Sequence, residues 1–379
     1  MNRHTLRLVL LSILFGLTVG ILAPRVMKGE WSTWFSEKEP HITLPEGELK
    51  TDAFSLLLLQ TALQTPEYPM TTVCPAAMTE ALHTMDSMSR GETHEQVKAL
   101  KLSPSAPELP ACMVLAAMEE TLPRPAEKQP ILPLPFRRNY PEAISTFNTL
   151  FGYPAADSGN SSQDTRLFMA LRTSFDFAFR QRFYQEDAKY GDFDNADGGL
   201  PSVFLMRRCG KFRIAEAEDG SWKAAALLLE GGNDDAALVA VLPQGKVRDF
   251  ALQLTPEQLS TIRRALAEAP PQEFTVELPR IDIAIGLRNI APLWQALGLT
   301  APFDIRTADF SPLTTDKLAL NAVAENLTCR MQESGRRPAD IPAADNCPKI
   351  FSLTRPFLWF AGDLTTDTPF VALGIVENL

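Results

Sequence analysis

The order of helical and strand patterns along the chain restricts its fold more than any other sequence feature. Three helical patterns come early, at 53–63, 75–89 and 91–100. Strand-type patterns come late, at 223–229, 237–242, 274–285 and 357–376. This order lacks the regular alternation of strand and helix that builds a parallel, doubly wound sheet. It therefore predicts an α+β fold with a largely antiparallel or mixed sheet.

Prolines dominate the stretch 103–141, which contains nine of them. Proline breaks helices and central strands, so we predict a helix only at 111–121 and loop or edge strand elsewhere in this stretch. The polar run 158–164 predicts a further loop. In the helix at 91–100, Thr93 is the expected N-cap, with Gln96 in the capping-box position.

Charge and motif content argue against several functional classes. The 379 residues carry a net charge of -10, whereas nucleic-acid binding needs a basic face. The only candidates for a triad base are His83 and His94, which lie beside polar neighbours on expected helices. Motifs of hydrolases, metalloproteases and nucleotide-binding loops are absent, and the run 231–235 suits a hairpin turn better than a calcium loop. We predict no enzyme, no metal site and no cofactor.

The N-terminus has the pattern of an export segment. Leu8 to Ala23 is an uncharged run of sixteen residues behind a basic start. It is short for a membrane span of roughly 20 residues, which favours a signal peptide. Pro24 makes a poor cleavage site, so residues 1–24 are either a signal peptide or an uncleaved anchor. A buried N-terminal helix is the other alternative, although the basic flank opposes it. Residues 25–48 are expected to be a tether.

Five cysteines are spread along the chain and form no CxxC motif. In an exported protein one disulfide is possible, but sequence alone cannot choose the partners. We expect mostly buried free thiols. The cysteines are Cys74, Cys112, Cys209, Cys329 and Cys347.

Seven segments resemble motifs of the serpin family, in the family's order. CPAAMTEALHTMDSMSRGET at 74–93 resembles S-P-x-S-I-x-x-A-L-x-M-x-x-x-G-A-R-G-E-T without a gap, and LMRRCGKFRIAE at 205–216 resembles M-M-x-R-x-G-K-F-x-Y-A-E. The other five segments are 53–63, 164–183, 238–246, 278–283 and 351–363. Each motif is weak by itself, but seven in order identify the chain as a divergent member. The stretch 103–163 is not clearly covered, and a helix across the main sheet is expected to be truncated or missing.

The resemblance implies a fold and a mechanism. Residues 49–379 would form one serpin-like domain with three β-sheets, about eight helices and an exposed reactive loop at about 335–350. In this family a serine protease attacks the loop and forms an acyl-enzyme. The cut loop then inserts as a new central strand of the main sheet and distorts the protease. The implied partner is an extracytoplasmic serine protease.

The hinge at the start of the loop departs from the family pattern. Glu333 and Gly335 fit it, but the following residues do not. Every second residue of an inserted strand faces the core. The residues that would face inward are two charged residues and two prolines, namely Arg336, Pro338, Asp340 and Pro342. We therefore predict a non-inhibitory or weak serpin; the alternative is sequence drift in a working suicide-substrate inhibitor.

Other departures concern sheet opening and the scissile bond. Positions that carry a polar cluster in the family are Cys74, Ala77, Leu171 and Glu325 here, and Phe179 stands in place of a tryptophan. Gly335 to Pro356 spans 21 positions, a few fewer than usual. Counting from the hinge places the scissile bond at Lys349–Ile350, whereas counting back from Pro356 places it near Asp345. Lys349 would suit a trypsin-like protease.

We expect an extracytoplasmic protein, either secreted or anchored. Its membrane contact would be limited to residues 8–23, and only if that segment stays uncleaved. We expect a monomer that does not bind nucleic acid.

Overall fold

A computed structural model describes residues 51–379 except 66–70, 103–110, 123–130, 152–161 and 366–369. All described residues belong to one compact unit, Leu44–Leu379. The expected export segment 1–24 and the tether 25–48 lie outside the described residues. Among the residues described, no helix combines the length and apolar character needed to cross a bilayer.

The early helical patterns form helices as expected. The described part of the chain contains seven α-helices: α2 (Thr51–Gln64), α3 (Pro75–Ser87), α4 (Gly91–Ala99), α5 (Tyr140–Phe151), α6 (Val247–Gln253), α7 (Pro256–Glu268) and α8 (Ala291–Ala296). The expected cap of α4 is wrong, because Arg90 is the N-cap. Thr93 is buried one turn later, and its hydroxyl accepts a hydrogen bond from the Asp309 main-chain N–H at 3.1 Å.

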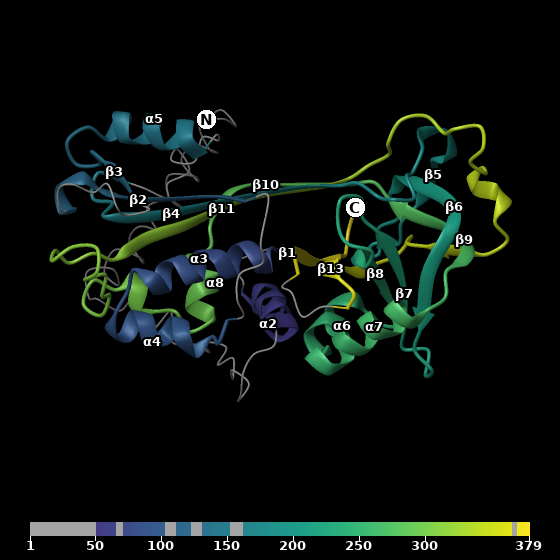
Figure 1. The fold of residues 1–379 in the computed structure, drawn as a ribbon, viewed down its shortest axis with the longest axis horizontal. Coiled ribbons are helices and arrows are strands. Elements are labelled where there is room, and N and C mark those ends of the chain that lie inside the picture. Colours follow the sequence, from purple (N-terminus) through teal and green to yellow (C-terminus); the bar gives the residue numbers. More distant parts are fainter. Residues whose placement is uncertain (1–50, 66–70, 103–110, 123–130, 152–161, 366–369) are drawn as a thin grey trace, which may run out of the picture. The chain divides into compact units, whose positions relative to one another are not determined.

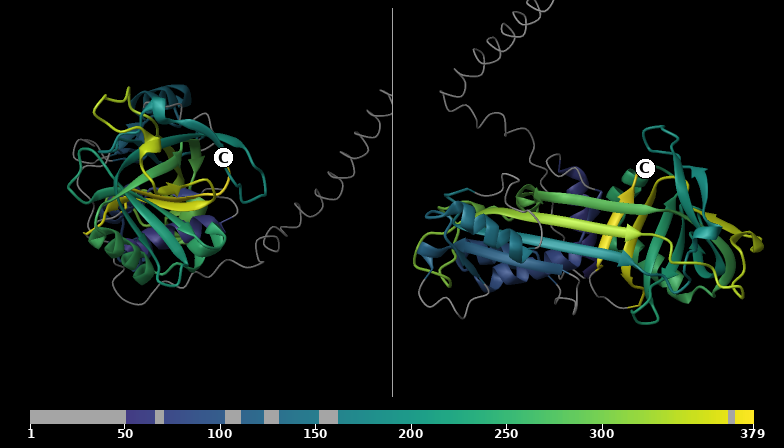
Figure 2. Two further views of the ribbon diagram at one scale, coloured as in Figure 1. Left: turned by 90° about the vertical axis from the view of Figure 1, so that its right-hand side faces the viewer. Right: turned by 90° about the horizontal axis from the view of Figure 1, so that it is seen from above.

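A five-stranded sheet has the order β10-β11-β4-β2-β3. Its strands are β2 (Ala111–Met118), β3 (Leu132–Leu134), β4 (Leu167–Phe177), β10 (Ile281–Asn289) and β11 (Leu320–Met331). The central strands β4 and β11 are parallel and pair along nearly their whole length, from Leu320↔Leu167 to Met331↔Phe177. They lie directly side by side, with no strand between them (Figure 2).

Strand β2 corrects the helix predicted at 111–121. Its sequence ACMVLAAM is rich in Ala, Leu and Met, which favour helix locally. In the structure it pairs antiparallel with β4 and parallel with β3. Long-range pairing and burial between two strands therefore override a modest local preference.

The second sheet has nine strands in the order β1-β14-β13-β8-β7-β6-β9-β12, with β5 also paired to β6. Its strands are β1 (Thr72–Val73), β5 (Lys189–Asp192), β6 (Ser202–Glu216), β7 (Trp222–Leu228), β8 (Ala236–Pro243), β9 (Gln272–Pro279), β12 (Ile350–Ser352), β13 (Phe357–Asp363) and β14 (Ala372–Val376). The long strand β6 pairs with β9 through its first part and with β7 through its last. The three expected sheets thus correspond to the five-stranded sheet and two portions joined by β6.

Helices cover both faces of the five-stranded sheet. Helix α5 packs on one face, and α3 and α8 lie against the other (Figure 1). Phe147 of α5 meets Phe168 of β4 edge-on, with ring centroids 5.0 Å apart. On the opposite side the Trp294 indole N–H donates to the Met78 sulfur at 2.7 Å. The stretch 103–163, which the resemblance left uncovered, thus contributes β2, β3 and α5.

The strands expected late in the chain also form, but one of them is divided into two. The expected hairpin forms from β7 and β8, and the C-terminal pair from β13 and β14. The run 274–285, expected as one strand, is split after Pro279 into β9 and β10, which belong to different sheets. Since β10 pairs with β11, this division places the loop after β11 beside β9.

Candidate functional site: the loop between β11 and β12

The loop expected to react with proteases connects the two sheets. Residues 332–349 leave β11 at the end of the five-stranded sheet and return to the nine-stranded sheet at β12 (Figure 1). The loop has two parts that are held differently. Residues 335–343 are the arch, and residues 344–349 are the anchor.

The expected hinge is fixed at the end of β11. The Glu333 side chain is only 2% exposed and accepts a hydrogen bond from Arg280 Nε at 3.0 Å. The Ser334 main-chain N–H donates to the Phe183 carbonyl at 2.8 Å. Gly335 follows with φ +68, a left-handed conformation that glycine adopts at low cost. The chain therefore turns away from the sheet at the position where the resemblance placed a hinge.

The arch is exposed but makes specific contacts through Arg337. Its main-chain N–H donates to Glu186 at 3.2 Å, and its guanidinium forms an ion pair with the buried Asp187 at 3.3 Å. Its Nη1 also donates to the Ile341 carbonyl at 2.8 Å. The pKa of Glu186 is lowered, first by its own main-chain N–H and then by the N–H of Arg337. The four residues expected to face inward after insertion are all exposed, namely Arg336, Pro338, Asp340 and Pro342.

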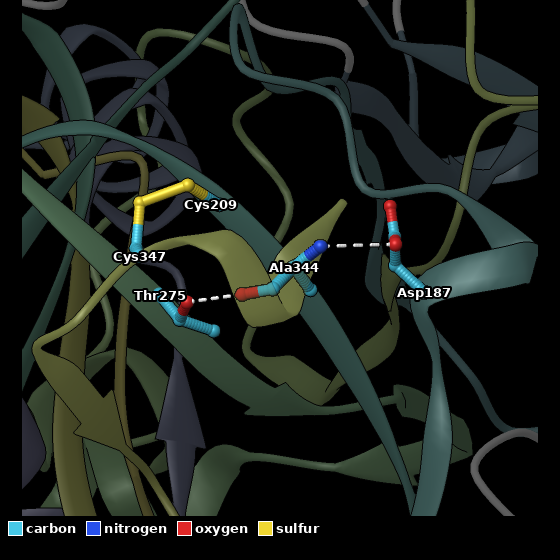
Figure 3. Close-up of a disulfide and its surroundings, with 5 residues drawn as sticks. All are labelled: Asp187, Cys209, Thr275, Ala344 and Cys347. Atoms are coloured by element: carbon cyan, nitrogen blue, oxygen red, sulfur yellow. Dashed lines mark hydrogen bonds between the residues drawn. A yellow bond between two sulfur atoms is a disulfide. The ribbon is translucent and has the colours of Figure 1, made fainter. Parts of the chain in front are cut away.

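The anchor is bound into the nine-stranded sheet. Ala344 is 1% exposed; its main-chain N–H donates to Asp187 at 3.0 Å, and its carbonyl accepts from the Thr275 hydroxyl (Figure 3). Three residues later, Cys347 forms a disulfide with Cys209 of β6, with Cα atoms 5.5 Å apart. This is the single disulfide that the sequence left possible without choosing its partners, and the expectation of mostly free thiols did not include it. Among the cysteines whose side chains are described, Cys74 and Cys329 are free and buried.

A network of charged side chains lies beside the anchor and contacts it through Asp345. Glu277 accepts hydrogen bonds from Arg207 at 2.9 Å and from Ser352 at 2.8 Å, and it forms an ion pair with Lys189 at 2.8 Å. Arg207 also reaches Asp345 of the anchor at 2.6 Å. Burial by itself would raise the pKa of Glu277, but these hydrogen bonds lower it below its ordinary value. The pKa of Asp345 is lowered by its hydrogen bond to Arg207.

Both scissile positions counted from the sequence fall in the anchor. Asp345 lies in a short 3-10 turn, Ala344–Asn346. The Lys349 carbonyl accepts from the Thr275 main-chain N–H at 2.7 Å, and Ile350 then begins β12 opposite Thr275. The Lys349 ammonium lies over the Phe274 ring, 5.4 Å from its centroid. The Lys349–Ile350 bond is therefore part of a strand pairing, and the arch is the segment that projects.

The residues expected to affect sheet opening do lie together. Leu171 and Glu325 are direct neighbours across the β4–β11 pair. Glu325 is 1% exposed and forms an ion pair with Arg288 at 3.3 Å. The Cys74 thiol donates a hydrogen bond to the Val371 carbonyl at 2.9 Å. Burial raises the pKa of this thiol to about 12, and the negative charge of Glu325 also raises it. Ala77 is buried on α3, where its main chain hydrogen-bonds Cys74.

Phe179 lies buried where β4 ends. Its ring meets that of Phe183 edge-on, with centroids 5.3 Å apart. Both rings line a cavity of about 160 Å³ that also touches Ser334 at the start of the loop. An aromatic side chain thus occupies the position that the resemblance assigns to a tryptophan.

Sequence reasoning missed the residues that hold the anchor. Cys209 was visible inside the segment 205–216, but its partner lies 138 positions away. Asp187 and Thr275 have no motif of their own, and each acts through the main chain of Ala344. The available signal was weak: one cysteine stood in the expected reactive loop and another in a strand motif.

Comparison with known proteins agrees with this architecture. The family model for serpin (serine protease inhibitor) matches residues 156–378. Alpha-1-antiproteinase S of Cavia porcellus is 26% identical over 214 residues, which is 55% of this chain and 51% of that protein. The chain thus spans about half the length of this curated relative.

Solved structures share the fold at low sequence identity. Uncleaved ovalbumin has a TM-score of 0.73 at 15% identity, covering 88% of this chain and 100% of that one. A maspin structure has a TM-score of 0.73 at 16% identity, with coverages of 88% and 98%. Serpin-12 of Manduca sexta has a TM-score of 0.70 at 15% identity, with coverages of 87% and 98%. With the family model matching more than half of the chain, this protein belongs to the serpin family.

Proposed function

We propose that this serpin is a non-inhibitory or weakly inhibitory member that acts by binding or scaffolding outside the cytoplasm. One observation carries the proposal. The residues that would face the core of the sheet after loop insertion are charged or proline, and all four are exposed here: Arg336, Pro338, Asp340 and Pro342. The paired strands β4 and β11 would have to separate to admit them.

Physical costs support a loop that stays outside the sheet. Burying Arg336 or Asp340 without a partner costs on the order of several kcal/mol each. Pro338 and Pro342 have no N–H to donate to a neighbouring strand. The hinge would also lose the contacts of Glu333 with Arg280 and of Ser334 with Phe183. A new central strand has to offset all of these terms before it stabilises the molecule.

The test is incubation with a panel of serine proteases followed by denaturing gel electrophoresis. An inhibitory serpin run in parallel gives the expected position of a covalent complex. For this protein we expect cleaved chain and free, active protease. A complex that survives denaturant would overturn the proposal.

A working inhibitor is the second candidate, favoured by one feature of the loop. Glu333 and Gly335 match the hinge pattern, and Gly335 adopts a turn with φ +68. Under this alternative the protein is a suicide-substrate inhibitor of an extracytoplasmic serine protease, trypsin-like if Lys349 precedes the scissile bond. The same gel separates the two candidates, because only an inhibitor retains the protease covalently.

The extracytoplasmic location is part of the proposal and rests on the run Leu8–Ala23. Cell fractionation should recover the mature chain outside the cytoplasm, and N-terminal sequencing should distinguish a cleaved chain from an anchored one. Recovery of the mature chain in the cytoplasm would contradict this part of the proposal.

A further inference from the structure

The disulfide divides the loop at a point that matters for proteolysis. Cys347 is 8% exposed and Cys209 is 5% exposed, so both lie within the body of the protein. The arch before the anchor has no covalent restraint, whereas Lys349 stands two residues after Cys347. Cleavage in the arch therefore leaves a new C-terminus without covalent restraint, whereas cleavage at Lys349–Ile350 leaves a new C-terminus two residues from the disulfide.

The distance from the disulfide to the five-stranded sheet determines whether a newly cut end can insert there. A strand inserted beside β11, which runs from Leu320 to Met331, must extend along about 12 residues, roughly 40 Å at 3.3 Å per residue. The disulfide keeps the Cα of Cys347 5.5 Å from that of Cys209 in β6, a strand of the other sheet. An acyl-enzyme ester on the Lys349 carbonyl is thus held at the nine-stranded sheet, because only two residues separate it from Cys347.

We propose that the Cys209–Cys347 disulfide is a redox-controlled lock on the loop. When oxidised, it confines protease access to the arch and keeps the segment around the Lys349–Ile350 bond paired with β9. When reduced, it releases the anchor. This inference deepens the proposed function and rests on it, since both require the loop to lie outside the five-stranded sheet.

The redox step needs a dithiol as reductant. A dithiol reduces the bond by thiol–disulfide exchange: one of its thiolates attacks a sulfur and forms a mixed disulfide, which its second thiol then resolves. Two electrons and two protons pass to Cys209 and Cys347, which become thiols, and the dithiol becomes a disulfide. No other co-reactant is required.

The contacts that remain after reduction are local and partly open to water. Asp345, which pairs with Arg207, has a side chain that is 82% exposed. Ala344 keeps hydrogen bonds to Asp187 and Thr275. A protease needs several consecutive residues in extended form, so residues 344–350 must leave β9 before Lys349–Ile350 can be cut. Among the described residues, the disulfide is the one covalent cross-link that opposes this release.

The experiment measures cleavage after Lys349 by a lysine-specific serine protease, with cut positions identified by mass spectrometry. Lys349 is the sole lysine in residues 332–349, so the cut is unambiguous. The samples are the oxidised full-length protein, the same protein with dithiothreitol, Cys347→Ser and the control Cys329→Ala, which removes a free buried thiol. We expect cleavage after Lys349 to be at least tenfold faster in the reduced protein and in Cys347→Ser.

An equal rate in all four samples, with Cys347→Ser folded by circular dichroism, would overturn the lock. If Cys347→Ser does not fold, hydrogen exchange of the wild type decides. Reduction should then accelerate exchange at residues 344–349 and leave α3 unchanged. Unchanged exchange at 344–349, with alkylation proving that both thiols are free, would overturn it as well.

Failure of the lock can be distinguished from failure of the proposed function. A denaturant-stable protease complex with the oxidised wild type defeats the proposed function, whatever happens after Lys349. A complex that forms only after reduction supports the lock and restricts non-inhibitory behaviour to the oxidised protein.

Discussion

The arch and the anchor are adjacent in sequence but are held in different ways. The arch contacts the body of the protein through Arg337, and the side chains on either side of this residue point to solvent. The anchor buries Ala344, ties Cys347 to β6 and adds Asp345 to a charged network. Exposure of a loop is therefore not uniform, and a scissile bond counted from sequence distance can fall in a part whose main chain is paired with a sheet.

Removal of the disulfide, the covalent bond that distinguishes the anchor from the arch, should have the largest effect on stability. Cys347→Ser should lower the free energy of unfolding by about 2–5 kcal/mol, because the disulfide closes a long loop in the unfolded chain. Urea denaturation measures this loss. Dithiothreitol should lower the stability of the wild type by a similar amount and leave Cys347→Ser unchanged; an effect of the reductant on the variant would contradict the assignment.

The charged network should give the next largest effect, and one that depends on pH. Glu277→Gln should cost about 2 kcal/mol near neutral pH, because it weakens the hydrogen bonds from Arg207, Lys189 and Ser352. The folded-state pKa of Glu277 lies below the ordinary value near 4.3. Its contribution is therefore complete above that value and is lost as pH falls through the lower folded-state pKa.

Urea titrations at a series of pH values check this sign. The stability difference between wild type and Glu277→Gln should be constant above about pH 5 and should shrink below about pH 4. A difference that grows on acidification would show that Glu277 is not held as an ionised carboxylate.

A smaller effect should separate the two neighbouring arginines of the arch. Arg337→Ala should lower stability by about 0.5–1 kcal/mol, because its partly exposed ion pair with Asp187 is lost. Arg336 is exposed, and Arg336→Ala is the matched control with an expected change near zero. The Arg337→Ala variant should also be nicked faster in the arch; equal nicking rates would show that this contact does not hold the arch.

The smallest expected effect is that of cutting the arch. A nick at its end, after Pro342, should leave the melting temperature almost unchanged, because insertion would bury Arg336 and Asp340 and place Pro338 and Pro342 in a strand. Four mismatches of about 1–3 kcal/mol each could cancel much of the gain from a new strand. Thermal melts before and after the nick test this. A rise of tens of degrees would show that the loop inserts and would favour the working inhibitor.

The sequence by itself determined the elements whose signals are local. The apolar spacing in α2 and α3, the hairpin of β7 and β8 and the C-terminal strands β13 and β14 agree with the patterns that predicted them. Each signal lies within about 20 residues, where helical or strand periodicity acts directly. The family motifs added the order of these elements and the place of the loop between β11 and β12.

Tertiary structure decided what depends on partners far along the chain. Residues 111–118 are a strand because β4 and β3 flank them, although their composition favours helix. Thr93 binds the main chain of Asp309 instead of capping its own helix. Cys209 and Cys347 meet across 138 positions because β6, β9 and β12 lie side by side in one sheet. No local pattern encodes such a meeting, since the energy of each contact depends on a neighbour that only the complete fold supplies.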